Sequence, residues 1–459
     1  MTKTNFLGRS LCAAAALMAL TQGASASDLF DAPAAFEGSV RISAADRAPT
    51  YPGSSVTVTG SGFAAGQTVW LERGNKVIVG PLQADAEGGF EAPLDIPADA
   101  AIGLHPVIAK TDAPDSAEVI TLKISPKIAL TGEDQFNITT AQLDGGLYQV
   151  AISEANNTLF VASAVGRPPV TESKLFKLDA DTLEVLAEVT PAEAPDRGAR
   201  DGGLYAVYGV AADDANGRVW VTNTRQNTVA VYSQDDLSLI KQFPDGAAAH
   251  PRDVLVDATR GRAYVSASSS GIEVYDLATL DHIETIAIAS GVRRGTFTAM
   301  SLALDSTHGA LYTVSLTSPE AVRIDLDTGE TKLIPISGNA GGTGIDVAGD
   351  TGHIFVVSQG SDDLKILDQE GNELVDVAVG AGALNVVYDE TLKLAFVANR
   401  ASDSIAAVTL EGEIAANLYG GSFPNFIEEA ADGTIYMVNK SKGTDDANGN
   451  MIWKIAPKS

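Results

Sequence analysis

The sequence predicts an all-β chain, and three observations support this prediction. A short phrase returns seven times: a hydrophobic residue, an aromatic residue, two mostly apolar residues, then Asn, Ser or Ala. Successive copies lie about 40 to 60 residues apart, a spacing typical of β-propeller blades built from short strands. A separate segment before the repeats alternates apolar and polar residues between Gly/Asp turns, as in a small β-sandwich. The chain also gives little helical signal. We therefore expect a seven-bladed β-propeller preceded by a small β-sandwich.

Residues 1–26 have the pattern of a cleaved export signal. Lys3 and Arg9 give a positive start, Leu11–Leu20 is too short to span a bilayer, and Ala24-Ser25-Ala26 fits a cleavage site. The mature chain is expected to begin at Ser27 and to reach the periplasm, with 27–37 as a flexible lead-in. The single cysteine, Cys12, lies in the signal, so the mature chain is expected to have no disulfide and no lipid anchor. No second apolar stretch predicts membrane insertion.

The chain is strongly acidic. Its 31 basic and 59 acidic residues give a formal charge of −28, and removing Lys3 and Arg9 with the signal leaves 29 basic residues and a charge of −30. Such a surface argues against general electrostatic binding of nucleic acid or anionic membrane, although it permits a local basic patch.

Residues 38–125 form the predicted sandwich. Strands are expected at 55–60, 67–71, 91–94, 106–110 and 119–122, with turns at 60–63 and 85–90 between them. The run VTVTGSGFAAGQTVWL, followed by ADAEGGF and IPADAAIGLHPV, resembles bacterial immunoglobulin-like modules that precede other domains in exported proteins. That resemblance implies a fold and no chemistry.

Residues 126–459 form the predicted propeller. The seven phrases are LFVAS at 159–163, VWVTN at 219–223, AYVSA at 263–267, LYTVS at 311–315, IFVVS at 354–358, AFVAN at 395–399 and IYMVN at 435–439. Each is expected to be the second strand of a blade, after an inner strand and a tight turn. The last blade ends at Ser459 without an outer strand of its own. We expect residues near 137–140 to supply it and close the ring, which hides both sheet edges.

The phrases, with Ile272–Leu280, resemble YVTN-type seven-bladed propellers over about 143–459. This resemblance implies the fold. Relatives of that type include exported proteins of little-known role, one of them a periplasmic binder of single-stranded DNA, and surface-layer proteins; lactonases and quinoprotein or haem-bearing propellers are more distant. Single-stranded nucleic acid is therefore a possible partner by resemblance, and no family site maps onto residues of this chain.

The motifs of catalysis and of metal binding are missing from the sequence. The five histidines have no partner at ligand spacing, and neither CxxCH nor GxSxG occurs. Most aspartates recur at fixed repeat positions, Asp213, Asp257, Asp305 and Asp389 among them, where they are expected to accept hydrogen bonds from turn amides. We therefore predict no catalytic, cofactor-binding or metal-binding residue.

One group of residues does suggest a site. In a propeller, the loops that enter the inner strands and the loops between strands two and three lie at the same end, around the central channel. These segments carry basic and aromatic residues that could bind an anion. The candidate ligand-binding residues are Arg167, Arg200, Arg225, His250, Arg252, Arg293, Arg294, Arg400, Lys440, Tyr148 and Tyr205. The alternative is that these cations pair with acids of the same loops, such as Asp201, Asp253, Asp362, Asp363 and Asp403.

The favoured hypothesis is a non-catalytic periplasmic binding or scaffold protein that holds an anionic small molecule, or an acidic protein partner, at the propeller end. An enzyme of lactonase or quinoprotein type is an alternative, but it would need clustered acid, base and metal ligands at the channel. A third hypothesis is that the protein is an envelope-structural or adhesion module.

Overall fold

The computed structural model describes residues 34–196, 198–268 and 271–458. The predicted export signal, Cys12 and most of the lead-in at 27–37 lie outside these residues. Apart from three short 3-10 helices, η2 (Ala45–Arg47), η3 (Glu133–Gln135) and η4 (Thr224–Gln226), the regular structure of the described residues is all β-strand. The predicted all-β class is confirmed.

The N-terminal part of the chain contains two sheets. One has the strand order β1 (Ser39–Ser43), β2 (Ser55–Ser61), β5 (Phe90–Asp95); the other has the order β4 (Lys76–Gln83), β3 (Thr68–Arg73), β6 (Gly103–Thr111), β7 (Ser116–Ile124). Every strand predicted here is present. The sequence analysis did not assign β1 or β4, and in β4 the pair Gly80-Pro81 interrupts the alternation of side chains. The immunoglobulin-like character of this part stays a prediction.

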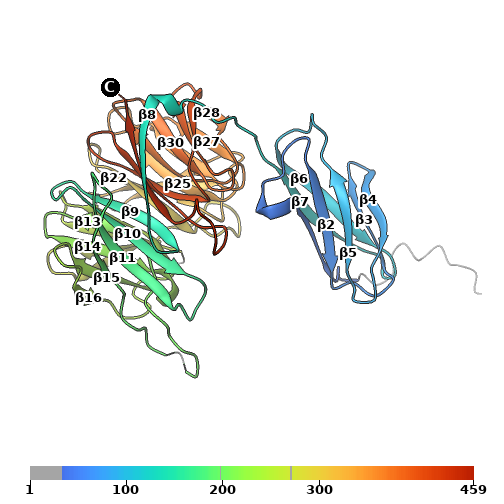
Figure 1. Ribbon diagram of the computed structural model, residues 1–459, viewed down its shortest axis with the longest axis horizontal. Coiled ribbons are helices and arrows are strands. Elements are labelled where there is room, and N and C mark those ends of the chain that lie inside the picture. Colours follow the sequence, from blue (N-terminus) through green and yellow to red (C-terminus); the bar gives the residue numbers. More distant parts are fainter. Residues whose placement is uncertain (1–33, 197, 269–270, 459) are drawn as a thin grey trace, which may run out of the picture. The chain divides into compact units, whose positions relative to one another are not determined.

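Seven four-stranded sheets follow, and each is a blade (Figure 1). Blades 1 to 3 are β9 (Leu147–Ser153), β10 (Thr158–Val165), β11 (Glu172–Asp179), β12 (Val185–Val189); β13 (Val207–Asp213), β14 (Arg218–Asn223), β15 (Thr228–Ser233), β16 (Leu239–Gln242); and β17 (Pro251–Asp257), β18 (Arg262–Ala267), β19 (Gly271–Asp276), β20 (His282–Ile286). Blades 4 to 6 are β21 (Ala299–Asp305), β22 (Ala310–Ser315), β23 (Glu320–Asp325), β24 (Thr331–Pro335); β25 (Gly342–Val347), β26 (Ile354–Ser358), β27 (Asp363–Leu367), β28 (Glu373–Ala378); and β29 (Ala383–Asp389), β30 (Leu394–Asn399), β31 (Ser404–Thr409), β32 (Ile414–Tyr419). Blade 7 is β33 (Pro424–Glu429), β34 (Ile435–Asn439), β35 (Met451–Pro457) and β8 (Phe136–Gln142).

The ring closes as the sequence predicted. Strand β8 pairs antiparallel with β35 and puts Thr139 opposite Lys454 and Thr140 opposite Trp453. In Figure 1 the teal strand β8 lies among the red strands of the last blade. Each inner strand contacts the next around the ring, and β33 contacts β9, so the first and last blades are neighbours.

The repeated phrase forms the core of every blade. Its seven aromatic residues are at most 4% exposed: Phe160, Trp220, Tyr264, Tyr312, Phe355, Phe396 and Tyr436. Apolar residues at nearly every position suit these strands because each blade is covered on both faces by its neighbours. The repeated aspartates cap turns as predicted; Asp305 Oδ1, for example, accepts the amide of His308 at 2.8 Å, and Asp389 Oδ1 accepts that of Thr391 at 2.7 Å.

Candidate functional site

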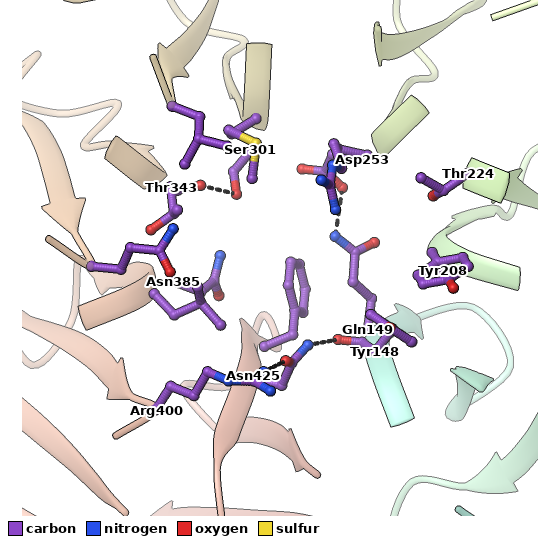
Figure 2. A pocket seen from close by; sticks show the side chains of 16 residues that line it. Tyr148, Gln149, Tyr208, Thr224, Asp253, Ser301, Thr343, Asn385, Arg400 and Asn425 are labelled. Carbon is purple, nitrogen blue, oxygen red and sulfur yellow. Dashed lines mark hydrogen bonds between the residues drawn. The ribbon is translucent and has the colours of Figure 1, made fainter. Parts of the chain in front are cut away.

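A cavity of about 270 Å³ opens where the inner strands begin (Figure 2). Its wall comes from two kinds of segment. The early residues of the inner strands contribute Tyr148, Gln149, Tyr208, Arg252, Asp253, Met300, Ser301, Thr343, Leu384, Asn385, Asn425 and Phe426. The segments after the second strands contribute Thr224, Leu316, Gln359 and Arg400. The predicted geometry of this propeller end is therefore correct. We call this end of the channel the mouth.

Two tyrosines whose rings are in contact and two cations form one side of the mouth. The rings of Tyr148 and Tyr208 have centroids 4.0 Å apart. The Lys440 ammonium lies 3.0 Å from the centroid of the Tyr148 ring, and Arg225 Nε donates to the Tyr208 hydroxyl at 3.0 Å. Both contacts place positive charge against electron-rich aromatic groups, which orients the cations without neutralising them.

Arg400 is held by an amide on the last inner strand. Its guanidinium donates to Asn425 Oδ1, while Asn425 Nδ2 donates to the Tyr148 carbonyl at 2.7 Å (Figure 2). The guanidinium also lies 5.1 Å from the centroid of the Phe423 ring. Since an amide carries no net charge, Arg400 keeps its full positive charge at the mouth.

Arg252 is the least compensated cation of the group. Its Nε is buried and has no hydrogen-bond partner among the described residues. Burial lowers the pKa of Arg252, and the neighbouring Arg225 lowers it further. The pKa of His250 is lowered by burial and then by Arg252 and Arg225, which places His250 in the same positive field.

The charged form of Lys440 is disfavoured for the same two reasons, burial and neighbouring cations. Burial lowers its pKa well below the usual value, and Arg400 and Arg225 add to the effect. In the described part of the chain, none of Arg225, Arg252, Arg400 and Lys440 forms an ion pair with a carboxylate. Partly buried cations without counter-ions are unfavourable alone, and an incoming anion would relieve them.

The waist of the channel lies just below these cations. Gln149 Nε2 donates to Asp253 Oδ1 at 3.0 Å, and the amide of Leu302 donates to Asp253 Oδ2 at 2.9 Å (Figure 2). Burial raises the pKa of Asp253 to about 6 despite these hydrogen bonds. Gly209 allows the neighbouring strands to approach closely here, because a Cβ at this position would lie 2.8 Å from the Arg252 carbonyl and 3.0 Å from Gln149 Oε1.

A second cavity of about 420 Å³ continues from the waist along the later residues of the inner strands. Its lining contains the acids Glu154, Asp253, Asp346, Glu428 and Glu429, and we call Asp346, Glu428 and Glu429 the floor. Burial raises the pKa of Asp346 to about 7 and that of Glu429 to about 8. Burial also raises the pKa of Glu428 well above its usual value, with Asp346 and Asp253 adding negative charge nearby.

The structure gathers some of the predicted site residues and separates others. Tyr148, Arg252 and Arg400 line the mouth, while Arg225, His250 and Lys440 lie beside them, as their contacts and mutual pKa effects show. Arg167, Arg200, Arg293 and Arg294 are exposed and do not line either channel cavity. Tyr205 is buried and donates to Asp245 Oδ1 at 3.3 Å. That the gathered residues bind a ligand stays a prediction.

The expected pairing of rim cations with local acids occurs in one place. Lys442 forms an ion pair with Asp403. Asp253 instead bonds to an amide side chain and to backbone amides, Asp201 accepts the amide of Gly203 at 2.8 Å, and Asp363 accepts from the Ser361 hydroxyl at 2.7 Å. The mouth cations therefore keep their charge unneutralised by these residues.

Sequence reasoning missed the amides Gln149, Asn385 and Asn425 and the acids of the floor. All of them lie inside inner strands rather than in loops. A polar residue within an otherwise apolar inner strand was the available signal, because such strands are buried on both faces.

No family model matches the chain. Curated relatives include two proteins described as uncharacterized protein YncE, one from Salmonella typhi and one from Salmonella typhimurium. Each is 24% identical to this chain over 318 residues, a match that covers 65% of this chain and 84% of the relative. The chain is thus distantly similar to YncE-type proteins, and the fold is that of a β-propeller repeat protein.

No group of three or more His, Cys, Asp or Glu side chains is arranged to hold a metal ion in residues 34–196, 198–268 and 271–458. Within the same residues, no helix has the length and apolar character needed to cross a membrane.

Proposed function

We propose that this protein is an exported, periplasmic binding protein that holds a small anionic molecule at the mouth of its propeller channel. One observation carries the proposal: Arg225, Arg252, Arg400 and Lys440 surround two tyrosines in ring contact, and no described carboxylate neutralises these cations. Arginine offers forked donors that match carboxylate, sulfate or phosphate oxygens. The export signal in the sequence supports the location.

The shape of the site favours a small ligand over a protein loop. The mouth is a concave cavity of about 270 Å³, close to the lower end of the usual size range of small-molecule sites. Amide groups of Gln149, Asn385 and Asn425 line it and could orient an uncharged part of the ligand. The acidic exterior of the chain would repel stray anions elsewhere, so the positive potential is local.

The test is calorimetric titration of the purified protein with sodium sulfate at constant ionic strength. We expect saturable binding that weakens at least about tenfold in the double variant Arg252→Gln/Arg400→Gln, because each charge-assisted hydrogen bond contributes about 1.5–3 kcal/mol. The matched control is Arg293→Gln/Arg294→Gln, which removes the same charge from an exposed loop and should leave the affinity unchanged. Equal affinity in both double variants would show that the mouth is not the anion site.

A further inference from the structure

The mouth and the floor are parts of one channel. The residues Asp253, Ser301, Asn385 and Phe426 line both cavities, so the two cavities adjoin. A ligand held by the mouth cations can therefore extend along the channel toward the acids. Asn425 at the mouth and Glu428 at the floor are three residues apart on β33, which corresponds to roughly 10 Å along a strand.

The floor is as poorly compensated as the mouth. No described cation forms an ion pair with Asp253, Asp346 or Glu428. Asp346 Oδ2 accepts the amide of Tyr388 at 2.7 Å, whereas Glu428 accepts a hydrogen bond from no described group. Carboxyl groups without a cationic partner, at the far end of a channel whose entrance carries cations without a carboxylate partner, favour opposite charges at the two ends of one ligand.

We propose that the ligand is a small zwitterion, with its anionic group at the mouth and a protonated amine roughly 10 Å away at the floor acids Asp346 and Glu428. This inference rests on the proposed function and adds the chemistry of the ligand's other end. A second anionic group would be repelled by the floor, while an ammonium group would gain charge-assisted hydrogen bonds. An extended peptide of three residues with free termini has this separation of charge, roughly 10 Å.

A change in protonation of the floor carboxyl groups provides a second way to detect ligand binding. With its pKa raised to about 7, the Asp346 carboxyl group is about half protonated at neutral pH, and Glu429, with a pKa of about 8, is mostly protonated. An ammonium group placed beside them favours their ionised forms and lowers their pKa. Ligand binding at pH 7 should therefore release protons to the buffer, which calorimetry in buffers of different ionisation enthalpy detects.

The probes are triglycine, N-acetyl-triglycine and triglycine amide, which have both charged ends, the carboxylate alone and the amine alone. We expect triglycine to bind at least about tenfold more tightly than either derivative, with proton release. In the variant Asp346→Asn/Glu428→Gln, triglycine and N-acetyl-triglycine should bind equally. Glu184→Gln is the matched control, because Glu184 is an exposed acid in the turn between β11 and β12 and should leave the preference intact. Sulfate binding by the floor variant verifies that its mouth is intact.

The outcomes separate the two proposals. Equal binding of triglycine and N-acetyl-triglycine by the unmodified protein would overturn the zwitterion inference, and so would sulfate binding without triglycine binding; both leave the anion site standing. Loss of sulfate binding together with triglycine binding would overturn the proposed function itself. A preference for triglycine that survives in the floor variant would remove Asp346 and Glu428 from the site.

Discussion

The mouth and the floor of the channel are built by the same inner strands and carry opposite charge. Strand β17 places Arg252 at the mouth and Asp253 at the waist, and β33 contributes Asn425 to the mouth and Glu428 to the floor. A shift of a few residues along one strand therefore changes the chemistry completely. The comparison shows that the propeller backbone determines the position of the channel, while the charge of the side chains differs from one end of the inner strands to the other.

The two regions differ in how their charges are held. Mouth cations lie against aromatic rings and amides, as Lys440 does on Tyr148 and Arg400 does on Asn425. Burial raises the pKa of the floor acids Glu428 and Glu429, and neighbouring carboxylates raise it further. Uncompensated charge in either region weakens the folded state, which is common where binding rather than stability has been selected.

The largest expected effect is a pH dependence of the unfolding free energy that has opposite signs for the floor and the mouth. A carboxyl group with a pKa raised by folding stabilises the protein while protonated, so stability falls as pH rises from the unfolded pKa through the folded one. Asp346, with a pKa near 7 against a usual 3.8, and Glu429, near 8 against 4.5, predict a decrease in unfolding free energy between about pH 4 and 8. Each pKa unit corresponds to about 1.4 kcal/mol.

Urea unfolding between pH 5 and 10 measures this dependence. Asp346→Asn/Glu429→Gln should flatten the decrease, because it removes both groups from which the decrease is derived. Lys440 acts in the opposite sense, because its lowered pKa makes stability rise with pH toward its usual 10.5, and Lys440→Met should remove that rise. His250, whose pKa is also lowered, opposes the floor below about pH 6.5. A flat profile in the unmodified protein would mean that the floor carboxylates are ionised and solvated.

The second prediction concerns the aromatic support that only the mouth has. Tyr148→Ala removes the ring that contacts both Lys440 and Tyr208. It should destabilise the protein by about 2–3 kcal/mol, less than the loss of a fully buried aromatic side chain, because Tyr148 is only partly buried. Tyr148→Phe keeps the ring and should change the unfolding free energy by less than about 1 kcal/mol. Both values come from urea unfolding at pH 7. Equal losses in the two variants would assign the stabilisation to the hydroxyl group instead.

The sequence predicted the blades and the mouth for one reason and missed the floor for another. The repeated phrase marks the second strand of each blade, so every flanking segment could be placed by counting, including the closing strand β8. Basic residues within or directly after a strand, such as Arg252, Arg400 and Lys440, reach the mouth cluster because the strand fixes their direction.

Residues in longer loops could not be placed in this way. Arg293 and Arg294 lie in the middle of the connection from β20 to β21, several residues from either strand, and they are exposed. Distance along the chain alone did not reveal this, since a long loop can turn away from the channel. The floor was not predicted because acidic residues recur at the turns that follow the inner strands. Asp346 and Glu428 differ from those residues only in lying inside an inner strand.

The smallest expected effect tests whether the mouth is strained while empty. Arg252→Met keeps an apolar stem of similar length but removes a partly buried charge whose Nε has no partner among the described residues. We expect a gain in unfolding free energy of about 1 kcal/mol at pH 7, since replacing poorly compensated buried charge by apolar groups is often stabilising. The same substitution in an exposed loop, Arg293→Met, should stay within about 0.5 kcal/mol of the unmodified protein. If Arg252→Met is instead destabilising, the guanidinium stabilises the protein in the absence of ligand. The buried charge at the mouth would then not lower the unfolding free energy. If it is stabilising and also weakens sulfate binding, the same charge that lowers stability is the one that attracts the ligand.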